Sequence, residues 1–268
     1  MSEFHEGCVA FVTGAASGIG LATARHLVSV GITKIALLDL SSDSLNNLPT
    51  ALTQLSPKTE VLILPTDVSQ EQEVEAAVKQ TVDRFGRIDI AFLAAGISGS
   101  MEAFETSEVE ALDKVLGVNL RGVWLCERAV VKVMLGQEER GLTTGLPYKT
   151  RGSIVNVGSV CSHITMVPNL TPYVMAKHGL LGLTRSTAMD LGPKGVRVNC
   201  VSPGWIKTAM TKEGHENKEA SDASCARVPM GRWGSPEEVA YLATFLLSDK
   251  ASYLTGGSYE VDGGMLCA

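Results

Sequence analysis

Short apolar segments alternate with longer amphipathic ones along almost the whole chain of 268 residues. The short segments are mostly unbroken apolar runs, which is typical of parallel strands covered on both faces. We predict strands at Cys8–Thr13, Ile35–Asp39, Val61–Pro65, Ile90–Ala94, Ser153–Val157, Arg197–Ser202 and Ser258–Val261. Strands that alternate with helices predict an α/β fold, here a doubly wound parallel sheet of seven strands with helices on both faces.

The amphipathic segments predict six helices, at Gly18–Ser29, Ser44–Leu55, Gln70–Phe85, Val109–Leu135, Pro172–Leu191 and Pro236–Leu247. Ser69 and Ser235 precede two of them as expected N-caps. The longest segments without such a pattern, Gly136–Gly152 and Thr208–Arg232, are expected to be irregular loops. No linker divides the chain, so residues 1–268 are expected to form a single domain, with 205–232 as a mobile segment beside the substrate.

The composition excludes several classes of protein. A formal charge of −6 with scattered basic residues argues against a nucleic-acid partner. No run approaches the roughly 20 apolar residues that cross a bilayer, so we expect a cytoplasmic protein without a membrane partner. The six cysteines lack CxxC or histidine spacing for zinc. We therefore expect buried, reduced thiols and no metal site.

A glycine-rich turn, Thr13-Gly14-Ala15-Ala16-Ser17-Gly18-Ile19-Gly20, joins the first predicted strand to the first helix. Three glycines at this spacing allow a tight turn and the close approach of a pyrophosphate, and the helix N-terminus supplies free N–H groups. This placement predicts a Rossmann fold that binds a dinucleotide. The expected contacts are Gly14, Ser17, Gly18, Ile19 and Gly20.

Asp39 ends the second predicted strand, where a carboxylate would accept both ribose hydroxyls of an adenosine. A 2′-phosphate at this position would meet a negative charge, and neither Leu40 nor Ser41 offers a cation to offset it. We therefore expect NAD(H) to be preferred to NADP(H). The alternative interpretation of Asp39 is a simple helix cap.

Tyr173 and Lys177 lie four residues apart in a predicted helix and therefore on one face. A phenol with a pKa of about 10 is a poor base at neutral pH, and a nearby ammonium lowers that pKa. We expect Lys177 to bring Tyr173 into the range useful for proton transfer. Ser159 follows a strand at the carboxyl edge of the sheet, where ligands bind, and is placed to hydrogen-bond a substrate oxygen.

Taken in order, these motifs resemble the short-chain dehydrogenases/reductases, in their shorter branch. The resemblance covers nearly the whole chain and includes Thr13–Gly20, Asp39, Asp67-Val68, Asn119, Ser159, Tyr173, Lys177, Arg197-Val198-Asn199, Pro203-Gly204 and Asp262-Gly263-Gly264. One departure is plain: the family usually has Asn-Asn-Ala-Gly after the fourth strand, and this chain has Leu93-Ala94-Ala95-Gly96. We expect another polar group or a changed packing to compensate.

The resemblance implies a role for each matched residue. Tyr173 would be the general acid/base, Ser159 would orient the substrate oxygen, and Lys177 would also hold the nicotinamide ribose. Asn119 would anchor a water that links Lys177 to solvent. Further cofactor contacts are expected from Asp67, Val68, Gly96, Pro203, Gly204, Ile206 and Thr208.

The substrate pocket is expected after the fourth to sixth strands and beyond Pro203, from Ser98, Cys161, His163, Trp205 and Met210, with Val160 and Asn169 as further candidates. Most are apolar or aromatic, which suits a mainly apolar substrate, cyclic compounds included. His163 has an alternative interpretation as a structural histidine. Cys161 has no basic neighbour in the sequence that would make it a nucleophile.

These features together predict an NAD(H)-dependent oxidoreductase that interconverts a secondary alcohol and a ketone. The alternatives are an NADP(H)-dependent ketoreductase of the same fold and a non-catalytic dinucleotide-binding regulator; a methyltransferase would not need the tyrosine–lysine pair. In the family the two long helices pair across a two-fold axis, so a homotetramer or homodimer is expected. The segment Gly136–Gly152 resembles loops of fungal members that act in secondary metabolism.

Overall fold

The computed structural model describes residues 3–46 and 48–267 of the chain. Its strands form one parallel sheet of seven in the order β3-β2-β1-β4-β7-β8-β9. They are β1 (Val9–Thr13), β2 (Lys34–Asp39), β3 (Glu60–Pro65), β4 (Ile90–Leu93), β7 (Gly152–Val157), β8 (Val196–Pro203) and β9 (Ser258–Val261). The predicted doubly wound sheet is confirmed, and each strand starts and ends within one residue of its prediction.

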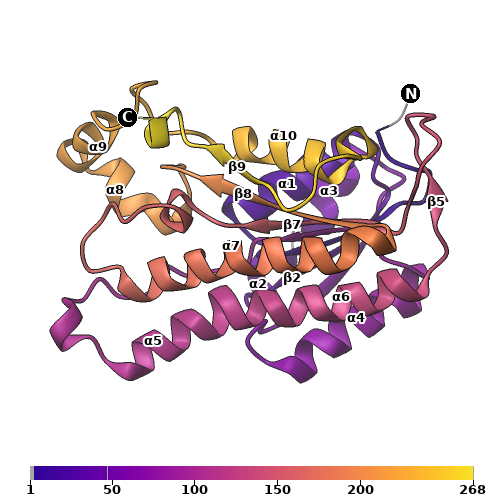
Figure 1. Ribbon diagram of the computed structural model, residues 1–268, viewed down its shortest axis with the longest axis horizontal. Coiled ribbons are helices and arrows are strands. Elements are labelled where there is room, and N and C mark those ends of the chain that lie inside the picture. The colour runs from indigo at the N-terminus through magenta and orange to yellow at the C-terminus, as the bar shows by residue number, and fades with distance from the viewer. Residues whose placement is uncertain (1–2, 47, 268) are drawn as a thin grey trace.

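Helices cover both faces of the sheet (Figure 1). One face carries α1 (Gly18–Ser29), α2 (Ser42–Asn46), α3 (Leu48–Leu55) and α10 (Pro236–Leu247), and the other carries α4 (Glu71–Phe85), α5 (Val109–Leu116), α6 (Val123–Gly136) and α7 (Thr171–Leu191). The helix predicted at Ser44–Leu55 corresponds to α2 and α3, on either side of residue 47, which lies outside the described residues. The cap at Ser235 is confirmed as a capping box with Glu238. Ser69 is not a cap: its hydroxyl donates to Asp67, and Gln70 precedes α4.

The helix predicted at Val109–Leu135 is one long rod, but its middle is wound differently (Figure 1). Residues Gly117–Gly122 form a π-helical segment, η2, between α5 and α6. Asn119 lies in this segment and is completely buried. π-Helical turns within α-helices are often found at functional sites, and this one turns an amide side chain inward.

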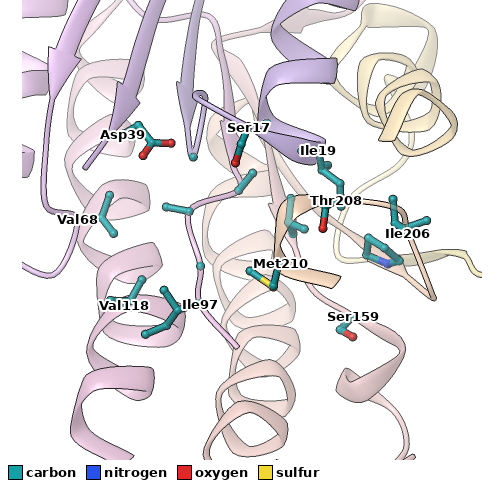
Figure 2. Close-up of a pocket in the computed structure, with 18 of the residues that line it drawn as sticks. Ser17, Ile19, Asp39, Val68, Ile97, Val118, Ser159, Ile206, Thr208 and Met210 are labelled. Carbon is teal, nitrogen blue, oxygen red and sulfur yellow. The ribbon is translucent and has the colours of Figure 1, made fainter. Parts of the chain in front are cut away.

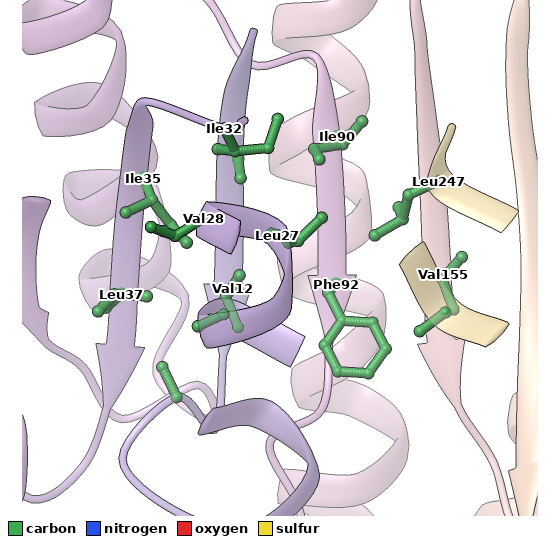
Figure 3. Close-up of a cluster of buried hydrophobic side chains, with 14 of the residues drawn as sticks. Val12, Leu27, Val28, Ile32, Ile35, Leu37, Ile90, Phe92, Val155 and Leu247 are labelled. Atoms are coloured by element: carbon green, nitrogen blue, oxygen red, sulfur yellow. The ribbon is translucent and has the colours of Figure 1, made fainter. Parts of the chain in front are cut away.

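Two hydrophobic clusters, one on each face, hold the helices to the sheet. Alternate residues of a strand point to opposite faces: Ala10 and Val12 of β1 belong to the cluster under α1, α3 and α10, and Phe11 belongs to the one under α4, α6 and α7. Figure 3 shows Val12 and Phe92 packed with Leu27 in the first cluster. The core thus fixes the strand ends that meet at the site.

Both segments expected to be irregular contain regular structure. Within Gly136–Gly152, β5 (Arg140–Gly141) and β6 (Lys149–Thr150) pair antiparallel. Thr208–Arg232 contains α8 (Lys212–Glu216) and α9 (Lys218–Cys225). The physical reason is an anchor on the body of the protein, because Trp233 donates from Nε1 to Ser221 at 3.0 Å and its ring lies 5.3 Å from that of Trp205. The mobility of 205–232 stays a prediction.

Short 3-10 helices complete the fold: η1 (Phe104–Thr106), η3 (Val160–Ser162), η4 (Gly192–Lys194), η5 (Ala209–Thr211), η6 (Asp249–Ala251) and η7 (Met265–Cys267). None of the helices in the described part of the chain has the length and apolar character needed to cross a bilayer. Cys8, Cys126, Cys161 and Cys200 are buried free thiols, as expected, but Cys225 is only half-buried and Cys267 is exposed. That exposure corrects the expectation for Cys267, which lies in η7 close to the end of the chain.

Candidate active site

A cavity of about 510 Å³ opens at the carboxyl ends of β1 and β4, where the order of the strands reverses. In doubly wound sheets ligands bind in this crevice. Every residue predicted for the cofactor lines it: Gly14, Ser17, Gly18, Ile19, Gly20, Asp39, Asp67, Val68, Gly96, Tyr173, Lys177, Pro203, Gly204, Ile206 and Thr208. Figure 2 shows Asp39 and Ser17 at one end of the cavity and Ser159 at the other.

The glycine turn is tight because its residues lie too close for side chains. A Cβ atom on Gly20 would lie 2.0 Å from the carbonyl oxygen of Gly14, and one on Gly14 would lie 2.8 Å from the backbone of Ala94 and Ala95. Gly14 also has a φ of +65°, in the left-handed region that favours glycine. The turn therefore leaves bare backbone, at the start of α1, facing the cavity.

Asp39 ties the end of β2 to the glycine turn. Its Oδ2 accepts a hydrogen bond from the backbone N–H of Ala16 at 3.0 Å, and its Oδ1 accepts from the N–H of Ser41 at 3.3 Å. The carboxylate lines the cavity and is only partly buried. It is thus held at the cavity wall by the turn that would bind phosphate. These contacts do not make Asp39 a simple helix cap. The N–H of Ala16, which donates to its carboxylate, precedes α1 and so belongs to another βα unit.

Two polar side chains hold the loop after β4 by hydrogen bonds. Thr13 Oγ1 accepts hydrogen bonds from the N–H groups of Ala94 and Ala95 at 3.1 and 3.2 Å. Asn119 accepts from the N–H of Ile97 at 2.8 Å and donates to its carbonyl at 2.7 Å. Leu93 packs into the core under α4, α6 and α7. That another polar group or a changed packing compensates for the missing asparagines stays a prediction, and Thr13 and Asn119 are the candidates.

The amide of Asn119 therefore holds the loop after β4 in place, and its oxygen lies 3.2 Å from where a Cβ on Gly96 would be. Asn119 does not line the cavity, and the described bonds of its side chain both go to Ile97. Its expected role in holding a water stays a prediction. What the structure adds is a positioning role, because a buried amide with both groups satisfied fixes one wall of the cavity.

Ser159, Tyr173 and Lys177 come together at the far end of the cavity. Ser159 follows β7, where its Oγ accepts from the N–H of Cys161 at 3.1 Å and its own N–H donates to Ser162. Tyr173 and Lys177 lie in the first turns of α7. Lys177 is 5% exposed, its Nζ donates to the carbonyl of Val157 at 2.7 Å, and this nitrogen is 5.5 Å from the centre of the Tyr173 ring.

The expected lowering of the Tyr173 pKa is wrong for this arrangement. Burial raises the pKa of Tyr173 to about 12, although a hydrogen bond with Ser159 opposes that rise. Burial also lowers the pKa of Lys177 to about 8. The physical reason is the burial of the phenol, and Lys177, whose Nζ donates to Val157, is not among the groups that lower the Tyr173 pKa.

Of the residues expected to bind substrate, Met210 lines the cavity and four do not. Ser98 is exposed and bonds to the carbonyl of Gly99. His163 turns toward β9, where its Nε2 lies 2.9 Å from Ser258 Oγ and 3.3 Å from Glu260, so the contacts favour the structural interpretation.

Cys161 and Trp205 belong to a small hydrophobic cluster beside Tyr173, which we call the substrate-side cluster: Val160, Cys161, Met166, Tyr173, Trp205, Val228 and Met265. Cys161 is buried and its pKa is raised by burial, which agrees with the expectation that it is no nucleophile. Asn169 is exposed and has a φ of +65°. This cluster covers the side of Tyr173 away from the glycine turn, and Val228 and Met265 reach it from α9's end and from η7.

Several lining residues were missed, namely Leu40, Ser41, Thr66, Ala94, Ala95, Ile97, Val118, Val157, Gly158 and Thr211. Most directly follow or end a parallel strand, and that position was the available signal. The sequence held no such signal for Val118, because the approach of this residue to the cavity depends on the π-helical turn of η2. Thr211 enters through η5, where it forms a capping box with Thr208.

Comparison with known proteins agrees with this geometry. A family model described as Enoyl-(Acyl carrier protein) reductase matches residues 14–266. Levodione reductase of Leifsonia aquatica is 38% identical over 97% of this chain and 94% of that protein. Cyclohexanol dehydrogenase of Acinetobacter sp. (strain SE19) is 34% identical over 98% of this chain and 96% of that protein.

A solved structure also resembles this chain over nearly its whole length. The crystal structure of levodione reductase superposes with a TM-score of 0.88 over 98% of each chain at 38% identity. These matches span the glycine turn, the cavity and the Tyr173–Lys177 pair. The chain belongs to the short-chain dehydrogenases/reductases and is an NAD(P)-dependent oxidoreductase.

Proposed function

We propose that this protein interconverts a secondary alcohol and a ketone with NAD(H), with Tyr173 as general acid/base. The observation that carries this proposal is one continuous cavity that joins the glycine turn to Ser159, Tyr173 and Lys177. A bound nicotinamide dinucleotide would supply or accept the hydride. The residues present fit such a group: bare glycine backbone at the start of α1 for its phosphates, Asp39 for a ribose, and a volume within the usual range for ligand sites.

The preference for NAD(H) rests on charge. Among the described residues that line the cavity, Lys177 is the one cation, and it lies beside Tyr173. Tyr173 bonds to Ser159, which lies at the far end from Asp39 (Figure 2). A 2′-phosphate beside Asp39 would meet a carboxylate with no cation among those lining residues to offset it. Replacing Asp39 with serine should weaken NADH binding by about ten- to a hundredfold, the usual worth of hydrogen bonds to a charged group.

The matched measurement is the dissociation constant of NADPH, which Asp39→Ser should leave equal or make tighter. The nearby exposed Asp43→Ser is the control and should change neither constant. If Asp39→Ser weakened the binding of NADPH more than the binding of NADH, the charge argument would be wrong.

The proton step follows from the position of Tyr173. Its phenol lies at the same end of the cavity as Ser159 and would donate a proton to a carbonyl oxygen. Ser159 stands beside it and would hold that oxygen by a hydrogen bond. In the reverse direction Tyr173 would take the proton of the alcohol.

The substrate is proposed to be mainly apolar. The substrate-side cluster packs against Tyr173, and the apolar side chains of Ile97, Val118, Ile206 and Met210 line the cavity. Cyclohexanol dehydrogenase and levodione reductase, by name, act on such compounds. A role in secondary metabolism, for which relatives such as the short-chain dehydrogenase fogB of Aspergillus ruber give a hint, is part of this proposal.

We further propose a cytoplasmic homo-oligomer, a tetramer or dimer. The face formed by α5, α6 and α7 leaves large apolar side chains uncovered, including Trp124, Met175 and Met189. Exposed apolar faces of this kind are typical of contacts between subunits.

The experiment is a screen of the purified protein against linear and cyclic ketones and alcohols, followed by nicotinamide absorbance. We expect NADH oxidation with apolar cyclic ketones and a lower kcat/KM with NADPH. Tight NADH binding without turnover on any ketone or alcohol would contradict the proposed reaction, and faster turnover with NADPH would contradict the proposed cofactor.

A further inference from the structure

A buried polar cluster lies under the sheet, outside the cavity. It joins Glu127 of α6, Asn156 of β7 and Thr184 of α7, which are 2%, 0% and 0% exposed. The amide Nδ2 of Asn156 donates to Glu127 Oε2 at 2.8 Å and to Thr184 Oγ1 at 3.1 Å. Thr184 in turn donates to the carbonyl of Leu180 at 2.9 Å. One carboxyl and one amide thus connect two helices with the strand between them.

Two acceptors in this cluster are left over. Glu127 Oε1 and Asn156 Oδ1 are buried, and neither finds a hydrogen-bond partner among the described residues. An ionised carboxylate can only accept, so it cannot satisfy the amide oxygen. A buried polar group without a partner destabilises the folded state. A neutral carboxylic acid has one hydrogen-bond donor and one acceptor. The carboxamide of Asn156 also presents one donor and one acceptor, so a neutral Glu127 can pair with it at both positions.

We propose that Glu127 is a neutral carboxylic acid in the folded protein, that it donates its proton from Oε1 to Asn156 Oδ1, and that this acid–amide pair positions the active-site strand. Both unpartnered atoms then gain a partner, and no ion or water is needed. Glu127 does not line the cavity, so it is a positioning residue.

The surroundings favour the neutral form. Burial raises the pKa of Glu127, while hydrogen bonds with Thr187 and Asn156 lower it, and no charge of a described residue is among the causes.

Charged side chains on the elements packed around Glu127 are engaged elsewhere. Arg128 and Lys132 of α6 pair with Glu71 and Glu75 of α4. Lys177 bonds to Val157, Arg121 bonds to the carbonyl of Ser69, and Arg197 bonds to carbonyls at the end of α10. Arg185 and Asp190 of α7 are exposed.

The cluster is placed to control the geometry of catalysis. Asn156 immediately precedes Val157, whose carbonyl holds Lys177 Nζ, and the strand leads directly to Ser159. Thr184 belongs to the helix that carries Tyr173 and Lys177, and Glu127 to the helix that continues from η2. Locking these elements together therefore fixes the relative positions of the residues proposed to transfer the proton.

The first test is infrared spectroscopy at pH 7. The difference spectrum between the wild type and Glu127→Gln should show the carbonyl stretch of a neutral carboxylic acid, which the control Glu105→Gln at an exposed glutamate should not remove. Absence of this band in the wild type would overturn the proposal.

The second test is unfolding by denaturant as a function of pH. A folded-state pKa above the unfolded value of about 4.3 gives stability that is complete below that value and is lost as the pH rises toward the folded pKa. Relative to Glu127→Gln, the unfolding constant of the wild type should therefore rise about tenfold per pH unit in this window. A ratio independent of pH would overturn the proposal, and Glu105→Gln should give no such slope.

The positioning role is tested by activity and rests on the proposed function. Glu127→Gln keeps a donor and an acceptor and should retain the wild-type kcat, whereas Glu127→Leu leaves Asn156 without its partner and should lower kcat with an unchanged dissociation constant for NADH. An unchanged kcat in Glu127→Leu would overturn the positioning role. The infrared and unfolding results need no substrate, so their failure is distinguishable from failure of the proposed reaction, and they stand if Glu127→Leu does not fold.

Discussion

The two ends of the cavity are built differently. At the dinucleotide end, the glycine turn, Asp39 and the loop after β4 are held by backbone contacts and by hydrogen bonds of Thr13 and Asn119. At the substrate end, Tyr173 packs against the substrate-side cluster, whose apolar side chains come from η3, α7, η7 and the segment after β8. The first end has geometry fixed by hydrogen bonds, and the second by packing, which tolerates substitution of similar volume.

The difference explains which substitutions should be severe. A hydrogen-bonded turn with no room for a side chain loses its geometry when a methyl group is added, because the backbone itself must move. A packed apolar wall changes shape when a side chain is shortened, and the rest of the site persists. The predictions below test this contrast, from the largest effect to the smallest.

Gly20→Ala should have the largest effect. The new methyl group would lie 2.0 Å from the carbonyl oxygen of Gly14, so the turn would have to open. We expect cofactor binding to be lost or the protein to fail to fold, as measured by NADH titration and circular dichroism. Gly182→Ala in α7, where the new methyl group would meet no described atom within 4 Å apart from its own stretch of helix, is the control and should bind normally. Normal NADH binding by Gly20→Ala would break the account of the dinucleotide end.

Thr13→Val should have an intermediate effect. It removes the acceptor for the N–H groups of Ala94 and Ala95, which should lower the free energy of unfolding by about 1–3 kcal/mol. Thr53→Val is the control, since the Thr53 hydroxyl donates only to carbonyls of its own helix. Equal unfolding free energies for both variants would show that Thr13 does not replace the missing asparagines.

Met210→Ala should have the smallest effect. Met210 is half exposed and lines the cavity near the substrate end, so its truncation should raise the KM of an apolar substrate about three- to tenfold, equivalent to roughly 1 kcal/mol of apolar contact. Leu40→Ala, at the Asp39 end, should instead weaken NADH binding and leave KM unchanged. If the two variants exchanged these effects, the assignment of the two ends would be reversed.

The same contrast explains how far the sequence could be interpreted. The glycine turn and the strand ends are local features, so their residues were predicted and all line the cavity. The substrate end depends on which way side chains turn after the backbone has folded. His163 follows Ser159 closely in the sequence, yet it turns to Ser258 and Glu260 because β9 lies beside it. The ring of Trp205 lies 5.3 Å from that of Trp233 in a tilted arrangement, and Trp233 follows two helices that no local pattern predicted.

The pKa of Tyr173 could not be predicted either. Spacing in a helix shows that Lys177 shares a face with Tyr173, but the pKa depends on burial and on where the ammonium finds its hydrogen bond. The replacement of the usual asparagines after β4 was visible, whereas the residues that hold this loop, Thr13 and Asn119, lie 81 and 22 positions away from the groups that they bind. Such contacts come from the tertiary fold alone.

The most direct test of the central claim is the rate of hydride transfer in Tyr173→Phe at saturating NADH, measured on any ketone that the wild type reduces. Removing the phenolic proton should slow the reaction by at least about a hundredfold, while the dissociation constant of NADH stays unchanged and Tyr253→Phe, at a fully exposed tyrosine, keeps the wild-type rate. A wild-type rate in Tyr173→Phe would contradict the assignment of Tyr173 as the proton donor.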